Sequence, residues 1–235
     1  MAQQSLMRRF AQWHIWLGWL VGVPIVMWVA SGLFMVIKPI EQVRGEHLRT
    51  PQAQMPLVIE GSEIATQDAA LKEMRVVMQN GRAIAILTGL DGATSRVDLE
   101  NGTPIPAIDA AGAREIAAKG IVGGEAVREV TFYSAQDVPF DFRRPMPVWR
   151  VALDDGTHVY IGRDTGQIEA VRTRWWRWFD FAWGVHIMDL SERSDTSHPI
   201  LIGFAALSLT GAILGCVLMF RRRKAKVKVK AETLA

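Results

Sequence analysis

With 235 residues, a hydrophobic fraction of 49% and nine tryptophans, the chain is more apolar than an average soluble domain. Its formal net charge is +3, but the excess of positive charge lies in the two tails, which hold nine of the 27 Lys and Arg and one acid, and the middle region has no basic stripe with interleaved aromatics. We therefore expect no nucleic-acid partner. A single cysteine, Cys216, excludes a disulfide framework within one chain.

Two long apolar runs predict transmembrane helices. Residues 15–37 and 199–220 are 23 and 22 residues long and carry no formal charge. A helix needs about 20 residues to cross a bilayer. The first run is also longer than the apolar core of a cleavable signal peptide, so we expect it to remain as an anchor.

Charge at the ends of the chain predicts the orientation. Arg8 and Arg9 precede the first run, and the second is followed by Arg221, Arg222, Arg223, Lys224, Lys226, Lys228 and Lys230. The positive-inside bias places residues 1–14 and the basic tail, residues 221–235, in the cytoplasm. The region between the spans is then outside, and the lipid bilayer is the first partner of the chain.

The region between the spans predicts an α+β module with two similar halves, residues 38–105 and 106–173. In the first half, residues 62–75 predict a helix and the Asn80-Gly81 pair predicts a hairpin. In the second half, an alanine-rich helix from about Asp109 precedes three strand-like stretches, VREVTFYSA, VWRVALDDG and HVYIGRDTGQIEAV. Each half would pack a helix on an antiparallel sheet, which suggests a duplicated unit.

The second half resembles a PepSY domain, whose closing "vDxxTGxi" signature stands here as YIGRDTGQIEAV. The spans resemble the PepSY-associated transmembrane family, because RRFAQWHIWLGW and FAWGVHIMDL are similar to its two histidine-bearing segments. Larger four-span relatives look like haem-containing reductases of the bacterial inner membrane that act on ferric siderophores. The resemblance implies an inner-membrane protein with a periplasmic module and an association with iron uptake.

His14 is the first candidate haem ligand. Gly18 and Gly22 follow it at i+4 and i+8, so that one helical stripe has an imidazole above two glycines. Such a stripe would admit a flat porphyrin. The alternative is a GxxxG packing face with His14 hydrogen-bonded at the helix interface.

His186 is the second candidate. A helix over residues 174–190 would surround it with Trp175, Phe179, Ala182 and Trp183, and a neutral imidazole in such surroundings is a competent axial ligand. The alternative is an interfacial helix whose aromatics form a headgroup-level belt, within the segment 174–198. The first span covers about 34 Å, so His14 and His186 cannot ligate one haem within one chain.

Two further features indicate partners or ligands. Gly211 and Gly215 form a second GxxxG, which fits a homodimer, a membrane-complex partner or packing between the two spans. Asp195 and His198 lie in a polar connector that would offer a cation oxygen and nitrogen ligands, although a charged linker before Pro199 explains them equally.

The Pro-rich loop of residues 137–150 is the predicted contact of the module with a ligand or partner. Arg143, Arg144 and Trp149 suit an anionic or aromatic ligand such as a ferric siderophore, and the alternative is a loop that packs its own aromatics. The chain contains no HExxH, GxSxG or phosphate-binding glycine loop, which disfavours a hydrolase. Two functions remain: haem-dependent electron transfer to a ferric substrate, or a non-catalytic anchored module that binds a protein partner.

Overall fold

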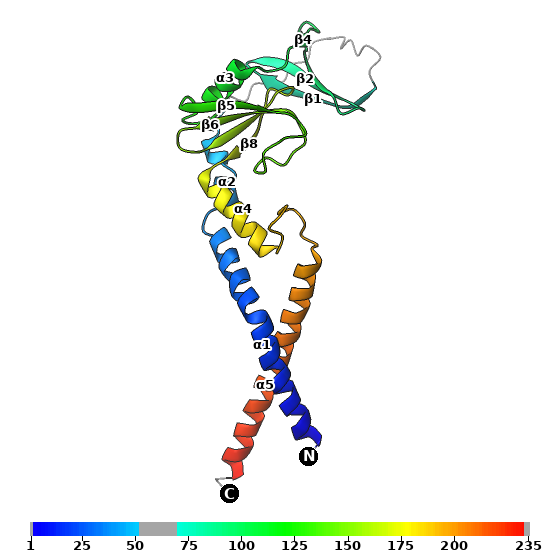
Figure 1. The fold of residues 1–235 in the computed structure, drawn as a ribbon, viewed down its shortest axis with the longest axis vertical. Coiled ribbons are helices and arrows are strands. Elements are labelled where there is room, and N and C mark those ends of the chain that lie inside the picture. Colours follow the sequence, from blue (N-terminus) through cyan, green and yellow to red (C-terminus); the bar gives the residue numbers. More distant parts are fainter. Residues whose placement is uncertain (1, 52–69, 233–235) are drawn as a thin grey trace. The chain divides into compact units, whose positions relative to one another are not determined.

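A computed structural model describes residues 2–51 and 70–232 of the chain (Figure 1). They fall into two compact units. The helical unit comprises residues 1–38 and 178–235, and the soluble module comprises residues 39–177.

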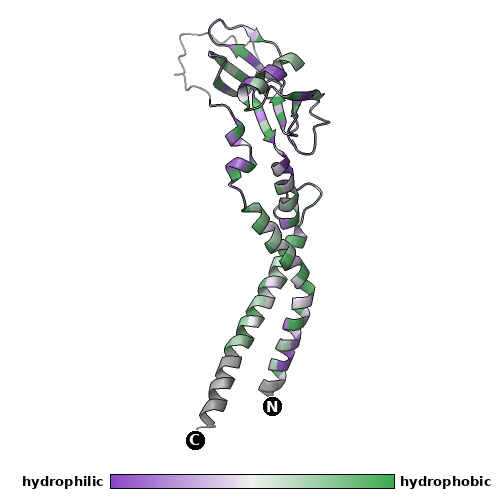
Figure 2. Ribbon diagram, turned by 90° about the vertical axis from the view of Figure 1, so that its left-hand side faces the viewer, coloured by the Kyte–Doolittle hydropathy of each residue, from purple (hydrophilic) through white to green (hydrophobic). Residues whose placement is uncertain are grey.

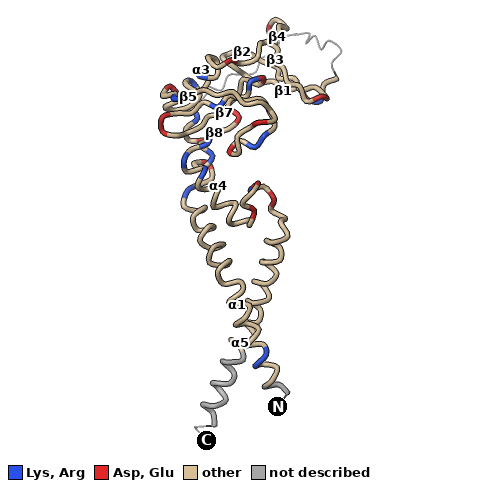
Figure 3. Tube along the Cα trace, viewed as in Figure 1, with Lys and Arg blue, Asp and Glu red and all other residues tan. Residues whose placement is uncertain are grey.

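The helical unit contains two long helices, α1 (Ala2–Met35) and α5 (Pro199–Glu232), and most of the shorter α4 (Arg174–His186). Residues 5–35 of α1 and 199–220 of α5 are long and apolar enough to cross a membrane. Figure 2 shows apolar residues predominating along both, and Figure 3 shows no charged residue along their middle parts. Their side chains are largely exposed, as expected for helices that face lipid and not a protein core. The chain is a membrane protein with an α+β region between its two candidate spans.

The first sheet of the module is an antiparallel meander in the order β1-β2-β3-β4. Its strands are β1 (Leu71–Gln79), β2 (Arg82–Gly89), β3 (Thr94–Asp98) and β4 (Pro104–Ile105). The predicted hairpin is present: Asn80 and Gly81 both have positive φ, as a two-residue type I′ turn requires.

The helix predicted over residues 62–75 is wrong where it can be compared with the structure. Residues 62–69 lie outside the described residues, but Leu71 to Arg75 belong to β1. Leu-Lys-Glu-Met-Arg favours a helix locally, yet residues 73–75 pair with residues 86–88 of β2. Long-range pairing therefore overrides local propensity here.

The second sheet has the order β5-β6-β7-β8 and is also an antiparallel meander. Its strands are β5 (Val127–Tyr133), β6 (Val148–Leu153), β7 (His158–Gly162) and β8 (Ile168–Arg172). The sequence predicts three strands in this half, with a turn at Asp-Thr-Gly. The structure has four, because HVYIGRDTGQIEAV makes both β7 and β8 on either side of that turn, where Gly166 has a φ of 62°.

Helix α3 (Ala110–Gly120) covers one face of the second sheet (Figure 1). The Asp109 carboxylate caps it by accepting a hydrogen bond from the Gly112 N–H at 2.8 Å. Ala113 and Ala117 are fully buried against the sheet, in a core with Ile121, Val151, Leu153, Val159, Ile161 and Val171. Small alanines let the helix approach the β-branched residues of the sheet closely. Two short helices, α2 (Ile40–Val43) and η1 (Glu46–Leu48), precede the first sheet.

Candidate functional site

His14 lies in the contact between α1 and α5. Its Nδ1 is 3.0 Å from the backbone oxygen of Gly211. A carbonyl oxygen can only accept, so Nδ1 carries a proton, and the neutral form of the ring has its lone pair on Nε2. The hydrogen-bond partner thereby fixes the tautomer of His14.

The glycines of α5 make this contact possible. A Cβ on Gly215 would lie 2.9 Å from His14 Cε1, and one on Gly211 would lie 3.8 Å from Leu17 Cβ. By contrast, a Cβ on Gly18 or Gly22 would meet no atom of the described residues within 4 Å. The GxxxG motif of α5 therefore faces α1, whereas that of α1 faces away from α5.

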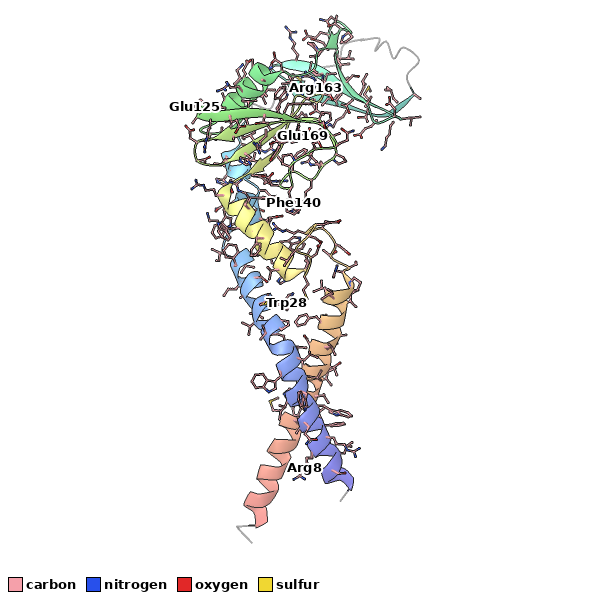
Figure 4. The ribbon with its side chains drawn as sticks, viewed as in Figure 1. Arg8, Trp28, Glu125, Phe140, Arg163 and Glu169 are labelled. Atoms are coloured by element: carbon pink, nitrogen blue, oxygen red, sulfur yellow. The ribbon has the colours of Figure 1, made fainter. Side chains whose placement is uncertain are left out.

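His186, the last residue of α4, is held by one turn of α1. Its Nδ1 lies 3.1 Å from the Trp28 carbonyl oxygen and 3.1 Å from Ser31 Oγ, and Ser31 Oγ itself donates to the same carbonyl at 2.9 Å. The imidazole stacks on Trp28, labelled in Figure 4, with ring centroids 4.8 Å apart and planes 13° apart. His186 thus also has a protonated Nδ1 and a lone pair on Nε2.

Sequence reasoning missed Trp28 and Ser31 as the neighbours of His186. The available signal was Ser31, a hydroxyl within an otherwise apolar run, because a polar group in that setting needs a partner. Gly32 lies against the same imidazole, because a Cβ built at this position would be 3.2 Å from His186 Cε1. A small residue is needed at this position for the imidazole to reach the backbone of α1.

Two buried aspartates, Asp189 of the connector and Asp180 of α4, hold the connector between α4 and α5. Asp189 accepts hydrogen bonds from the backbone N–H groups of Glu192, Ser194 and Asp195 and from the Ser191 hydroxyl, and these bonds lower its pKa. Asp180 pairs with Arg193 at 2.7 Å.

The residues of the predicted cation site have other contacts in this connector. Asp195 accepts from the Ser197 N–H at 2.8 Å, and His198 Nδ1 lies 3.4 Å from the Ile200 nitrogen at the start of α5. Within residues 2–51 and 70–232, no group of three His, Cys, Asp or Glu side chains is placed to hold a metal ion. A cation at Asp195 and His198 stays a prediction.

In the module, Asp141 of the Pro-rich loop is the centre of a half-buried polar cluster. Its carboxylate accepts from the Tyr160 hydroxyl at 2.5 Å and from His158 Nδ1 at 3.2 Å, and Arg177 lies 4.0 Å away. The sequence alone shows no partner for His158 and would favour a surface residue, but its side chain is only 24% exposed and pairs with Asp141.

The cluster shifts the pKa of the Tyr160 hydroxyl and that of the Asp141 carboxyl in opposite directions. Burial and the hydrogen bond to Asp141 raise the pKa of Tyr160. Burial alone would raise the pKa of Asp141, but the hydrogen bonds from His158 and Tyr160, with the charges of His158 and Arg177, outweigh it and hold that pKa below its ordinary value of 3.8.

The predicted ligand-contact residues of the loop have partners within the module. Arg143 Nε donates to the Phe140 carbonyl at 2.9 Å, with its guanidinium 4.4 Å from the Phe140 ring centroid. Arg144 pairs with Glu169 of β8 at 3.0 Å, and Trp149 Nε1 donates to the Ile108 carbonyl at 2.8 Å. Figure 4 labels Phe140 and Glu169 at these positions. The side chain of Arg144 remains 49% exposed.

Comparison with known proteins identifies the class. The family described as "PepSY-associated TM region" matches residues 11–234, which include most of the first candidate span, all of the second and the whole module. The chain belongs to this PepSY-associated transmembrane family. No curated protein matches it, and no solved structure does.

The contact between His14 and α5 predicts a specific packing defect. Replacing Gly215 with Ala places a methyl group 2.9 Å from His14 Cε1, so the ring or the helix must shift. We expect a loss of about 1–3 kcal/mol in the stability of the helix pair, measured by thermal unfolding in detergent. Gly203→Ala is the matched control, because its Cβ would meet no described atom within 4 Å. Equal stability of the two variants would contradict the packing described here.

The Asp141 cluster predicts acid sensitivity of the module. A carboxylate with a depressed pKa stabilises the folded state at a pH above its ordinary value of 3.8, and the stabilisation is lost as the pH falls through the folded pKa. Asp141→Asn should cost about 1–3 kcal/mol at pH 7 and should flatten the decline below pH 4. Hydrogen exchange of the β6 and β7 amides at pH 7 and pH 3 measures both effects. Asp137→Asn, in the same loop, is the control.

Proposed function

We propose that the protein binds haem through His14 and His186 and passes electrons across the membrane to a ferric, siderophore-type substrate outside. The observation that supports this most directly is the tautomer of both histidines. Each donates Nδ1–H to a backbone carbonyl oxygen and keeps its lone pair on Nε2. Histidines that ligate metals almost always donate their other ring N–H to a carboxylate, carbonyl or water.

The residues around His186 fit a haem ligand well. The ring is held by Trp28 and Ser31 of α1 and stacks on Trp28, and its neutral form offers Nε2 as a nitrogen donor. When bound, haem supplies a one-electron carrier whose potential depends on its axial ligand and on burial. His186 would hold the iron, and Trp28 would fix the ring plane.

The hydrogen bond of His14 also suits a metal ligand, but α5 lies close to its Nε2. Its Nε2 lies 3.4 Å from the position that a Cβ on Gly215 would take, so α5 covers this side of the ring. Holding haem there would require α5 to shift away from His14. Of the two candidate ligands, His186 is therefore the stronger.

The two histidines define separate sites. His14 and Ser31, the partner of His186, are 17 positions apart on α1, which corresponds to about 26 Å along the helix axis. One haem cannot span that distance. Bis-histidine ligation at either site would need another histidine or a second chain, and a homodimer through the open Gly18 and Gly22 face would bring a second chain close.

Orientation and architecture complete the proposal. The positive-inside bias supports cytoplasmic termini and a module on the other side of the membrane, and the family resemblance supports a bacterial inner membrane with a periplasmic module. There the module would receive the ferric substrate at Arg143, Arg144 and Trp149. The two four-stranded meanders support a duplicated PepSY-like unit.

The alternative function is a membrane-anchored module that binds or regulates a protein partner without catalysis. One observation favours it: the contact of His14 with Gly211 and Gly215 is a complete account of that histidine as a helix-packing residue. The same experiment distinguishes the two functions.

Haem binding predicts a visible spectrum. Protein purified in detergent from haem-replete membranes should show a Soret band and a sharp α-band after dithionite reduction. His186→Ala should remove at least half of the haem, and His14→Ala should lower the haem content further. His47→Ala, an exposed histidine of the module, is the control. A flat spectrum of well-folded protein would remove the electron-transfer proposal and leave the anchored module.

The predicted substrate contact is tested with a trianionic ferric tris-catecholate. Arg143→Ala combined with Arg144→Ala should weaken its binding about tenfold or more, as measured by quenching of tryptophan fluorescence, because two cations of the loop, one over Phe140 and one over Phe142, are lost. The exposed pair Arg114→Ala and Arg128→Ala removes the same charge elsewhere and should leave binding unchanged. Equal affinity of both double variants would exclude this loop as the contact.

A further inference from the structure

A cavity of about 490 Å³ lies in the soluble module, between residues of both sheets and α3. Its lining includes Arg49, Gln79, Arg96, Lys119, Ile116 and Ile168. It shares no residue with the Pro-rich loop. A cavity of this volume is within the range that holds small organic ligands.

Arg96 of β3 is the unusual member of the lining. It is only 5% exposed, and its two terminal nitrogens donate to the Gln79 side-chain oxygen at 3.2 Å and to the Pro106 carbonyl at 2.7 Å. These bonds use two of the five N–H groups of a guanidinium. Its Nε is buried without a hydrogen-bond partner among the residues that the structure describes.

No carboxylate in the described part of the chain forms an ion pair with Arg96. Burial lowers the pKa of Arg96, and the charge of Asp164 counteracts this only from a distance. Buried charges are normally paired, because an isolated one loses its hydration without compensation. The guanidinium therefore has the charge to bind an anion and one unused N–H on each terminal nitrogen, whereas its Nε is covered by the protein.

The PepSY signature turn makes room for this side chain. Gly166 of the Asp-Thr-Gly turn has a φ of 62°, and a Cβ there would overlap Nη1 of Arg96. The Thr165 carbonyl of the same turn accepts a hydrogen bond from Gln79 Nε2 at 2.8 Å. Hydrogen bonds therefore connect the signature turn to Gln79 and Gln79 to Arg96 at the cavity.

The rest of the lining determines the ligand class. Arg49 and Lys119 add two cations against one acid, Glu115, which pairs with Lys119 at 2.5 Å. The apolar part of the lining comes from Ile108, Ile116 and Ile168. A planar guanidinium matches a carboxylate, and the isoleucines match an aliphatic group beside it.

We propose that this cavity binds a small carboxylate ligand with an aliphatic body, whose carboxylate is held by Arg96. A free aliphatic acid and the C-terminus of a peptide both present this chemistry. The site is independent of haem binding, so it stands or fails separately from the function proposed above.

The test is isothermal titration of the full-length protein in detergent with three probes. These are acetyl-trialanine with a free C-terminal carboxylate, the same peptide with a C-terminal amide, and hexanoate. We expect one carboxylate to bind per chain and the peptide amide to bind at least tenfold more weakly than the peptide acid. Binding of the peptide acid indicates a peptide C-terminus, and binding of hexanoate alone indicates a free acid.

Three variants test whether the carboxylate binds in this cavity. Arg96→Met should weaken binding at least tenfold while the melting temperature stays equal or rises, because an uncompensated buried charge is removed. Lys119→Met, at an exposed position of the lining, should weaken binding severalfold without affecting the fold. Arg82→Met, whose guanidinium pairs with Asp98 and does not line the cavity, is the control. Failure of both carboxylates to bind, or unchanged binding in both Arg96→Met and Lys119→Met, would overturn the proposal.

Discussion

The hydrogen bond from an imidazole Nδ1 to a backbone carbonyl oxygen is the interaction on which the helical unit depends. A polar side chain in an apolar helix needs a partner, because lipid offers none. His14 finds it at Gly211 and His186 finds it at Trp28. In both cases a small residue, Gly215 or Gly32, provides the space. The hydrogen bond from Nδ1 thus packs the helices, and it leaves Nε2 of the same ring available as a nitrogen donor.

The soluble module contains two buried polar centres of opposite character. Asp141 is a carboxylate with donors on both oxygens, and it stabilises the Pro-rich loop on β7. Arg96 is a cation without a carboxylate in contact among the described residues. The first is complete within the chain, as a structural cluster must be. The second is incomplete, and this difference separates a structural centre from a candidate binding site.

The sequence allowed prediction of features that depend on local chemistry. Apolar length predicts the spans, Asn80-Gly81 predicts its hairpin, and Asp109 precedes the alanine-rich helix that it caps. Features that depend on pairing between distant segments were out of reach. Leu71 to Arg75 is a strand because β2 pairs with it, and Trp28 meets His186 across 158 positions of the chain. The composition of a segment does not encode which partner it will find.

The account is tested most directly by the protonation of the two imidazoles. Nitrogen-15 spectra of the histidine-labelled protein in lipid or detergent, assigned with His14→Ala and His186→Ala, distinguish a protonated Nδ1 from a protonated Nε2. We predict that both neutral rings carry the proton on Nδ1 and that Nε2 has the signal of an unprotonated nitrogen, or of a ligated one when haem is present. An unprotonated Nδ1 in either residue would contradict the hydrogen bonds from which the proposed function is derived.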